Sequence, residues 1–147
     1  MRLNFDVAII GGGSAGYSAA STAQSLGAHV AIIDPGPLGG LCILKGCMPT
    51  KTILRSSDIM ALMRRAKEFG ILPVDPHASL SAINDRKNKL IQEFTDYRVE
   101  QLKDSRFTLI QERAKFISPH EICVGDQILK AKSFILATRY SHEYLGL

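Results

Sequence analysis

The sequence predicts a single α/β domain spanning residues 1–147, with a parallel sheet, helices on both faces of that sheet and a small antiparallel β-meander. Three observations predict this fold: a strand-helix-strand pattern near the start, two longer stretches with apolar residues at helical spacing, and short strand-like pieces near the end. At 147 residues the chain is long enough for one domain with a sizeable core. Hydrophobic residues at 46% and charged residues at 22% match a globular domain and not a disordered chain.

The strand-helix-strand unit comes first. Its parts are a buried strand at Phe5–Ile10, the glycine run 11–13, a small-residue helix from Ser14 to about Leu26 and a second apolar strand at Ala28–Ile33. Gly27 breaks the helix, and the Asp34-Pro35-Gly36 turn ends the second strand.

The later elements alternate less regularly. A glycine-rich loop from Pro37 to Gly46 leads to a helix from about Thr50 to Phe69, which Gly70 and Pro73 end. A second helix runs from about Ser79 to Lys103, and a strand follows at Phe107–Ile110. The meander pieces are at Lys115–Ile117, Glu121–Val124 and Gln127–Leu129, and a last buried strand is at Ser133–Ala137. Turn signals at Ser118-Pro119 and Gly125-Asp126 separate the meander pieces.

The placement of the basic residues argues against a nucleic-acid partner. The formal charge is +4, but the small basic clusters at 64–67 and 86–89 fall on amphipathic helices without interleaved aromatic residues. No apolar run approaches the ~18 residues of a membrane helix. The apolar stretch Val7–Ile10 is too short for a signal peptide. We therefore expect a cytoplasmic chain without nucleic-acid or membrane partners.

Gly11, Gly13 and Gly16 form a G-x-G-x-x-G motif between a predicted strand and a predicted helix, as in Rossmann-like nucleotide sites. The first glycine permits a tight turn, the second lets the backbone approach a pyrophosphate, and the third allows close packing of the helix on the strand. The helix start at Ser14 and Ala15 offers free N–H groups to a phosphate.

Asp34 follows Gly16 by 18 residues, close to the ~20-residue offset at which an acid binds an adenosine ribose and repels a 2′-phosphate. A glycine-rich turn followed by a turn aspartate explains each feature singly but not their joint spacing.

Cys42 and Cys47 enclose four residues, unlike the C-x-x-C spacing of zinc or thioredoxin-type motifs. In a regular helix their separation along the axis would be ~7.5 Å, beyond the ~7 Å limit for a disulfide. Gly39, Gly40 and Gly46 provide the freedom for an irregular backbone. On spacing alone, a redox disulfide and two free loop thiols remain equal alternatives. Three cysteines in a reducing compartment argue against a structural disulfide framework.

The string Gly39-Gly40-Leu41-Cys42-Ile43-Leu44-Lys45-Gly46-Cys47-Met48-Pro49-Thr50-Lys51 resembles the active-site signature of the flavin-dependent pyridine nucleotide-disulfide oxidoreductases. This family contains dihydrolipoamide dehydrogenase, glutathione reductase and mercuric reductase. The stretch Phe134–Thr138 resembles the end of the family's first FAD segment. The resemblance therefore implies an incomplete FAD domain of the glutathione reductase type.

The resemblance also implies roles for individual residues. Cys47 would be the charge-transfer thiolate beneath the flavin, Cys42 the exposed interchange thiol that attacks a substrate disulfide, and Lys51 the lysine beside the reactive flavin edge. The residues expected to bind FAD are Gly11, Gly13, Ser14, Ala15, Gly16, Asp34, Gly40, Lys51, Ala114 and Thr138. Cys123, on an apolar strand, has no implied role and fits a buried, inert residue.

The chain departs from the family signature at three positions. Leu41 and Leu44 stand where the family has Thr and Asn, and Arg139 stands where it has Gly. The family also uses a nicotinamide-binding domain for NAD(P)H and an interface domain that donates a His-Glu pair across a homodimer, and we expect neither within these 147 residues. The histidines at 29, 77, 120 and 142 fit solvated residues better than an acid-base catalyst.

Three hypotheses follow. The chain is the FAD and redox-disulfide portion of an NAD(P)H-dependent enzyme acting on a disulfide-type substrate; or a non-catalytic fragment or split subunit that binds FAD and needs a partner chain; or an NAD-binding Rossmann domain without flavin.

Overall fold

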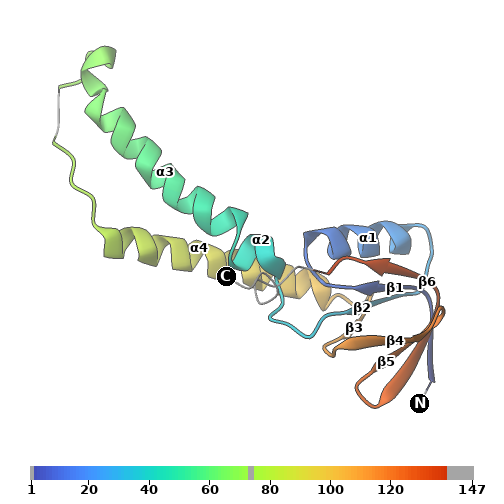
Figure 1. Ribbon diagram of the computed structural model, residues 1–147. Helices are drawn as coiled ribbons and strands as arrows, with labels where there is room; N and C mark the ends of the chain where they lie inside the picture. Colours follow the sequence, from blue (N-terminus) through green and yellow to red (C-terminus); the bar gives the residue numbers. More distant parts are fainter. Residues whose placement is uncertain (1, 73–74, 139–147) are drawn as a thin grey trace.

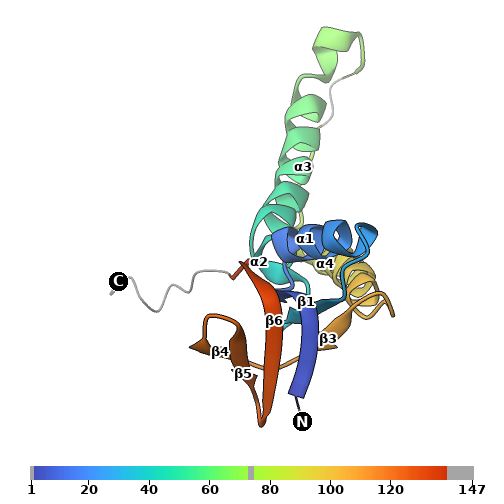
Figure 2. The same ribbon diagram turned by 90° about the vertical axis from the view of Figure 1, so that its right-hand side faces the viewer.

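A mixed six-stranded sheet organises the molecule, with strand order β3-β2-β1-β6-β5-β4. The computed structural model describes residues 2–72 and 75–138, and the predictions at Pro73, Arg139 and His142 lie outside them. Figure 2 shows β1 (Arg2–Ile10) and β6 (Gln127–Leu136) side by side, with β3 (Thr108–Ile110) on one side and β5 (Glu121–Val124) and β4 (Ala114–Ser118) on the other. The predicted α/β class is confirmed.

Four of the strands form the parallel part of the sheet. The apolar run of β1 pairs with β2 (Val30–Ile33) and with β6, so Ile9 lies between Ile32 and Ile135. Strand β3 continues the parallel order beyond β2. The four residues of β2 are all buried, as a central parallel strand requires.

Strand β6 joins two segments that the sequence pattern separates. The predicted meander piece at Gln127–Leu129 and the predicted strand at Ser133–Ala137 are one strand, Gln127–Leu136. Its first half pairs antiparallel with β5, and from Ile128 onward it pairs parallel with β1. The meander is therefore part of the same sheet as the nucleotide-binding strands.

Two apolar clusters lie on opposite faces of the sheet. One consists of Phe5, Ala8, Ala31, Ile33, Ile122, Val124, Leu129 and Ala131. The other consists of Ile9, Ala20, Val30, Ile32, Leu38, Leu102 and Phe107, and includes residues of α1 (Ser14–Ser25) and α4 (Leu80–Leu102). Within the described residues the helices thus cover one face, whereas side chains of β5 and β6 fill the core of the other. Figure 1 shows α1 on the side of the sheet away from β4 and β5.

A helical hairpin extends away from the sheet (Figure 1). It consists of α3 (Cys47–Arg64), the short 3₁₀ helix η1 (Ala66–Phe69) and α4. Arg86 Nη1 on α4 donates to the Thr52 carbonyl oxygen on α3 at 3.1 Å. The start of α4 agrees with the prediction, because the Ser79 hydroxyl accepts the Ala82 N–H at 3.3 Å as an N-cap.

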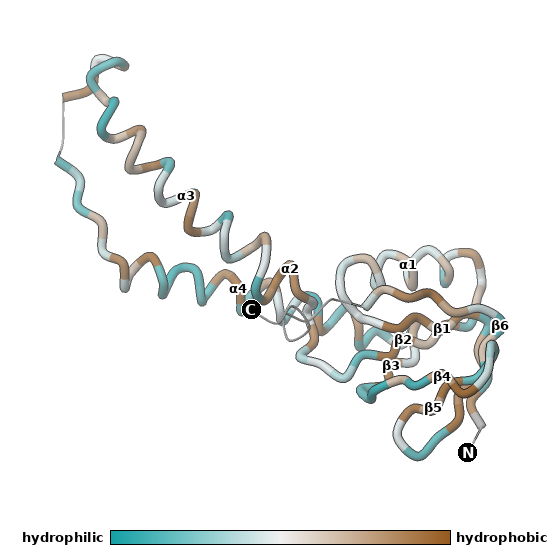
Figure 3. The backbone as a smooth tube through the Cα atoms, viewed as in Figure 1, coloured by the Kyte–Doolittle hydropathy of each residue, from teal (hydrophilic) through white to brown (hydrophobic). Residues whose placement is uncertain are grey.

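The hairpin exposes apolar side chains that the sheet domain does not cover. Figure 3 shows hydrophobic and hydrophilic residues alternating along α3 and α4, whereas the tube is most continuously hydrophobic along the strands. Near the tip, Phe69, Leu72 and Leu80 are 63%, 85% and 74% exposed. Among the described residues, no helix combines the length and apolar character needed to span a membrane.

Candidate functional site

The glycine motif forms the turn between β1 and α1, at the carboxyl end of the parallel strands. Gly11 N–H donates to the Ile33 carbonyl oxygen at 2.8 Å, which ties the turn to β2. Gly13 is the N-cap of α1, and no side chain caps that end. The first-turn residues Ser14 and Ala15 are exposed. The helix start therefore presents free N–H groups and partial positive charge, as predicted for a phosphate site.

Two of the three motif glycines meet backbone that leaves no room for a side chain. A Cβ on Gly16 would collide with the Gly11 carbonyl oxygen, and a Cβ on Gly11 would collide with the Ala137 carbonyl oxygen. Gly11 also has φ +111°, a conformation that favours glycine. At Gly13 the nearest protein atom to a Cβ is Gly40 Cα at 3.8 Å, an ordinary contact. The space beside Gly13 is thus open to a ligand.

Gly40 connects the glycine turn to the cysteine segment. It begins α2 (Gly40–Leu44) with φ +77°, and a Cβ on it would lie 2.7 Å from Gly13 Cα. This five-residue helix was predicted as part of a loop, because it is too short to show helical periodicity. The two backbones approach this closely because Gly40 has no side chain. The structure therefore places the start of the cysteine segment against the predicted phosphate turn.

Asp34 stands at the end of β2 and holds the turn together. Its Oδ2 accepts the Gly12 N–H at 2.6 Å, and its Oδ1 accepts the Gly36 N–H at 2.8 Å. The carboxylate is half-buried. The spacing of the motif predicts a ribose-binding role for this acid but does not reveal its backbone partners, since no residue pattern marks a carboxylate that accepts N–H groups from a distant turn. Each oxygen retains a further lone pair for a ligand hydroxyl.

The two cysteines lie on either side of the break between α2 and α3. Cys42 is in α2, Cys47 begins α3, and both thiols are free. A Cβ on Gly46 would lie 3.1 Å from the Leu41 carbonyl oxygen and 3.2 Å from Cys42 Cα. Gly46 therefore permits the close return of the chain that brings Cys47 next to Cys42.

The thiols interact electrostatically with each other and with Lys51. A hydrogen bond with the Cys47 side chain raises the pKa of Cys42, partial burial raises it further, and the Lys51 ammonium group opposes the rise. Cys42 is half-buried and Cys47 is exposed. This differs from the order of exposure that the resemblance implied, in which a flavin covers Cys47.

The remaining candidate residues lie on three different elements. Thr138 follows β6 and its N lies 3.1 Å from the position of a Cβ on Gly11, so it adjoins the glycine turn. Lys51 is exposed on α3. Ala114 begins β4, pairs with Val124 and packs against the cluster on the meander face. Cys123 is half-buried and donates its S–H to the Gly125 carbonyl oxygen at 3.1 Å.

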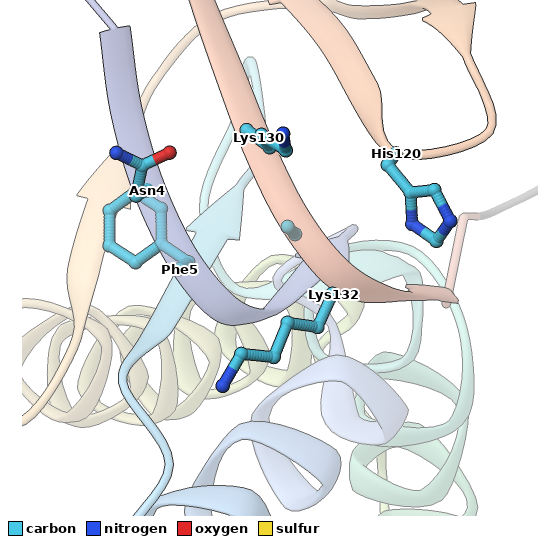
Figure 4. Close-up of a pocket in the computed structure, with 6 residues that line it drawn as sticks. Asn4, Phe5, His120, Lys130 and Lys132 are labelled. Carbon is cyan, nitrogen blue, oxygen red and sulfur yellow. The ribbon is translucent and has the colours of Figure 1, made fainter.

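Cavities indent the surface of the part of the chain that the structure describes. One of about 400 Å³ is lined by Asn4, Phe5, His120, Lys130, Ala131 and Lys132 (Figure 4). It lies near the start of β1, and the glycine turn follows the other end of that strand, so it is not part of the nucleotide site. Another, of about 390 Å³, adjoins the cysteine segment. Among the described residues, no three His, Cys, Asp or Glu side chains cluster as metal ligands.

Comparison with known proteins agrees with this geometry. A family model described as pyridine nucleotide-disulphide oxidoreductase matches residues 5–145. The mercuric reductase of Lysinibacillus sphaericus is 35% identical over 92% of this chain and 25% of its own length. The dihydrolipoyl dehydrogenases of Chlamydia muridarum and Bacillus subtilis are 34% and 33% identical over 94% and 90% of this chain, each over 30% of its own length.

The chain thus spans between a quarter and a third of the length of these relatives. The matched region contains the glycine turn, the acid at the end of β2 and the cysteine pair. With a family model that covers nearly all of its residues and relatives that align along most of its length, this chain belongs to the pyridine nucleotide-disulphide oxidoreductase family.

Proposed function

We propose that this chain is the FAD-binding, redox-cysteine portion of an NAD(P)H-dependent disulfide oxidoreductase. One observation carries the proposal: Gly40, which begins the helix bearing Cys42, contacts Gly13 of the predicted phosphate turn. A dinucleotide whose pyrophosphate lies on that turn would therefore extend directly toward the cysteine pair.

The residues of the turn fit FAD. The open space at Gly13 and the uncapped start of α1 suit a pyrophosphate, and Asp34 has acceptor capacity for a ribose. Lys51 has its charge close to Cys42, where the reactive part of the cofactor is expected. When bound, FAD supplies two-electron redox chemistry that the side chains of this chain lack.

The cysteine pair performs thiol–disulfide exchange. The Cys42 thiolate attacks one sulfur of a substrate disulfide, forms a mixed disulfide and releases the first substrate thiolate. The Cys47 thiolate then attacks the Cys42 sulfur, forms the Cys42–Cys47 disulfide and releases the second substrate thiolate. The dithiol loses two electrons, the substrate gains them, and the two cysteine protons end on the released thiolates or in solvent. Lys51 favours the Cys42 thiolate by opposing the rise in its pKa.

Further parts are expected to complete the reaction. The relatives are named as mercuric reductases and dihydrolipoyl dehydrogenases, so the substrate is a small disulfide, a protein-bound disulfide or a thiol-binding metal ion. A nicotinamide site and an interface domain would come from additional sequence or from a partner chain. The exposed side chains of Phe69, Leu72 and Leu80 support a covering partner for the hairpin. Three cysteines, with a pair that must cycle through its dithiol form, support a cytoplasmic location.

Spectroscopy and thiol mapping test the proposal. The purified chain should bind FAD saturably and should bind NAD more weakly by about a hundredfold, a difference of ~2.7 kcal/mol. After mild oxidation, mass spectrometry should show one intramolecular disulfide joining Cys42 and Cys47, with Cys123 still alkylatable. Tight binding of NAD without FAD binding would instead support the flavin-free Rossmann hypothesis. A Cys42→Ser, Cys47→Ser double variant serves as the control for the disulfide.

A further inference from the structure

The cavity beside the cysteine segment has no role in the proposed function so far. Its volume is about 390 Å³, and it lies between the α2–α3 junction and α4. Leu44 and Lys45, two of the four residues between the cysteines, line one side, and Lys87, Asn88 and Thr95 of α4 line another. Any molecule that occupies this cavity therefore contacts the loop that carries the reactive pair.

The lining has a positive charge that the protein does not neutralise. Lys45 is exposed and Lys87 is half-buried. Within residues 2–72 and 75–138, neither lysine forms an ion pair. Gln92, another lining residue, donates its side-chain amide to Asp96 Oδ1 at 2.8 Å. Two lysines that line a partly enclosed space attract an anion more strongly than the same lysines in bulk water.

Polar groups in the lining could add hydrogen bonds to such an anion. The Asn88 side chain lines the cavity, and its amide can donate. The Thr95 hydroxyl already donates to the Ile91 carbonyl oxygen at 2.7 Å, but its oxygen can still accept from a ligand or a water. Leu44, at the position where the family signature carries Asn, contributes an apolar wall. The cavity therefore combines charge, one amide and apolar surface.

We propose that this cavity holds an anionic group of the substrate, and that the substrate class is a disulfide bearing carboxylate or phosphate groups. The inference rests on the proposed function, because it assigns the substrate end of the same cysteine site. A lysine ammonium is a compact charge without a bidentate geometry, so it suits either anion. Binding at Lys45 and Lys87 places the anionic end of the substrate beside the cysteine loop.

Exchange rates with disulfides of different charge test this assignment. The full chain carrying Cys123→Ser is reduced, freed of reductant and mixed with dianionic 5,5′-dithiobis(2-nitrobenzoate) or with neutral 2,2′-dithiodipyridine. The ratio of the two second-order rate constants cancels any change in thiolate fraction, because both reagents react with the same thiols. Lys87→Gln should lower this ratio by about fivefold. Lys89→Gln, with the same charge change on α4 but outside the cavity lining, should leave the ratio unchanged.

Salt and competing anions extend the test. In ~1 M NaCl, where the screening length is ~3 Å, the ratio of rate constants measured with the Cys123→Ser parent should fall to the value measured with Lys87→Gln. At equal ionic strength, stronger competition by inorganic phosphate than by acetate identifies the phosphate-bearing class, and the reverse identifies the carboxylate-bearing class. Circular dichroism checks the fold of each variant, and Lys45→Gln replaces Lys87→Gln if that variant misfolds.

The outcomes separate the two proposals. The anion site would be overturned if the ratio of rate constants were the same in the Cys123→Ser parent, in Lys87→Gln and in Lys45→Gln. The proposed cysteine chemistry would then still stand. If even the neutral disulfide yields no Cys42–Cys47 disulfide, the proposed function fails, and the anion site fails with it.

Discussion

At the residue scale, Gly13 and Gly40 are in contact, but a side chain at one would affect FAD binding and a side chain at the other would affect folding. Gly13 has φ −70°, which any residue adopts, and a Cβ there meets only Gly40 Cα at 3.8 Å. Gly40 has φ +77° and its Cβ would lie 2.7 Å from Gly13 Cα. A side chain at Gly13 therefore occupies ligand space, whereas a side chain at Gly40 strains the protein itself.

We predict that Gly13→Val weakens FAD binding by about a hundredfold or more and leaves most of the fold intact. Gly40→Ala should lower the unfolding temperature as well as the affinity, because of its backbone conformation and the close contact. Isothermal titration and thermal circular dichroism measure the two effects. Wild-type FAD affinity in Gly13→Val would show that the pyrophosphate lies elsewhere.

A second prediction concerns Asp34, whose carboxylate accepts the Gly12 and Gly36 N–H groups. Asp34→Ala should weaken FAD binding by about tenfold or more, since hydrogen bonds to a charged acceptor contribute ~1.5–3 kcal/mol. It should also destabilise the turn. Asp34→Asn keeps one acceptor oxygen and should lose less of both. Unchanged dissociation constants and unfolding temperatures in Asp34→Ala would contradict both roles of the carboxylate.

Some of these residues could be predicted from the sequence and others could not, for physical reasons. Gly11, Gly13 and Gly16 are found by spacing, because each serves a conformational need that repeats at fixed offsets. The partners of Asp34 are found only in three dimensions, since Gly12 precedes it by 22 residues. Lys87 was assigned to a solvated helix face, and only the fold shows that it lines a cavity with Lys45.

At the element scale, β6 shows where pattern recognition failed. Leu129 and Ala131 are buried while Lys130 and Lys132 are exposed, the period of two expected for a strand. The two lysines interrupt an otherwise apolar stretch and suggested a break between two strands. By contrast, α4 was predicted within one residue at each end, because a long helix carries many periodic positions and a serine cap.

The cysteine segment yields a prediction about thiol reactivity. In flavin-free protein, iodoacetamide should alkylate exposed Cys47 faster than half-buried Cys42, since the raised pKa of Cys42 lowers its thiolate fraction near neutral pH. Cys47→Ala removes the hydrogen bond and should lower the pH midpoint for Cys42 alkylation. Lys51→Gln removes an opposing charge and should raise that midpoint. Midpoints that move in the same direction in both variants would contradict this account.

Asp6 on β1 links β6 to the residue that precedes β2, and this gives a pH-dependent prediction. Its Oδ2 accepts the His29 N–H at 2.8 Å, and its Oδ1 pairs with Lys132 Nζ at 2.7 Å. The Lys132 hydrogen bond, the His29 N–H and the Lys132 charge lower the Asp6 pKa. A carboxyl with a lowered folded-state pKa stabilises the fold above its unfolded pKa and loses that effect as pH falls through the folded value.

Asp6→Asn should therefore lower the unfolding temperature slightly near neutral pH, and the difference from the unmodified chain should vanish in strong acid. Thermal unfolding between pH 7 and pH 2 measures this, with Asp126→Asn on an exposed turn as the control. A difference that grows toward low pH would have the wrong sign for the Asp6–Lys132 pair.

At the scale of the whole molecule, the last prediction is that the polypeptide of residues 1–147 alone does not sustain NADH or NADPH oxidation coupled to a disulfide. These residues contain one glycine-rich nucleotide motif, and the proposed function assigns it to FAD. No second such motif in this sequence is available to hold a nicotinamide. His29, His77 and His120 are exposed, and none is assigned to the cysteine site. Among the described residues, these histidines therefore give no positioned proton donor for the substrate thiolate that Cys42 displaces, and such a donor typically contributes ~10²–10⁴-fold to rate.

Chemical reduction should still succeed in the same polypeptide, because the glycine turn and the cysteine segment are in contact through Gly13 and Gly40. Dithionite should reduce FAD-loaded protein, and two alkylatable thiols should then appear at Cys42 and Cys47. A Cys42→Ser variant cannot form the disulfide, so its Cys47 should be alkylatable before and after dithionite treatment, and its flavin should still be reduced. Steady NADPH or NADH consumption with lipoamide or glutathione disulfide, by residues 1–147 without any added chain, would show that these residues contain a nicotinamide site that the glycine motif does not account for.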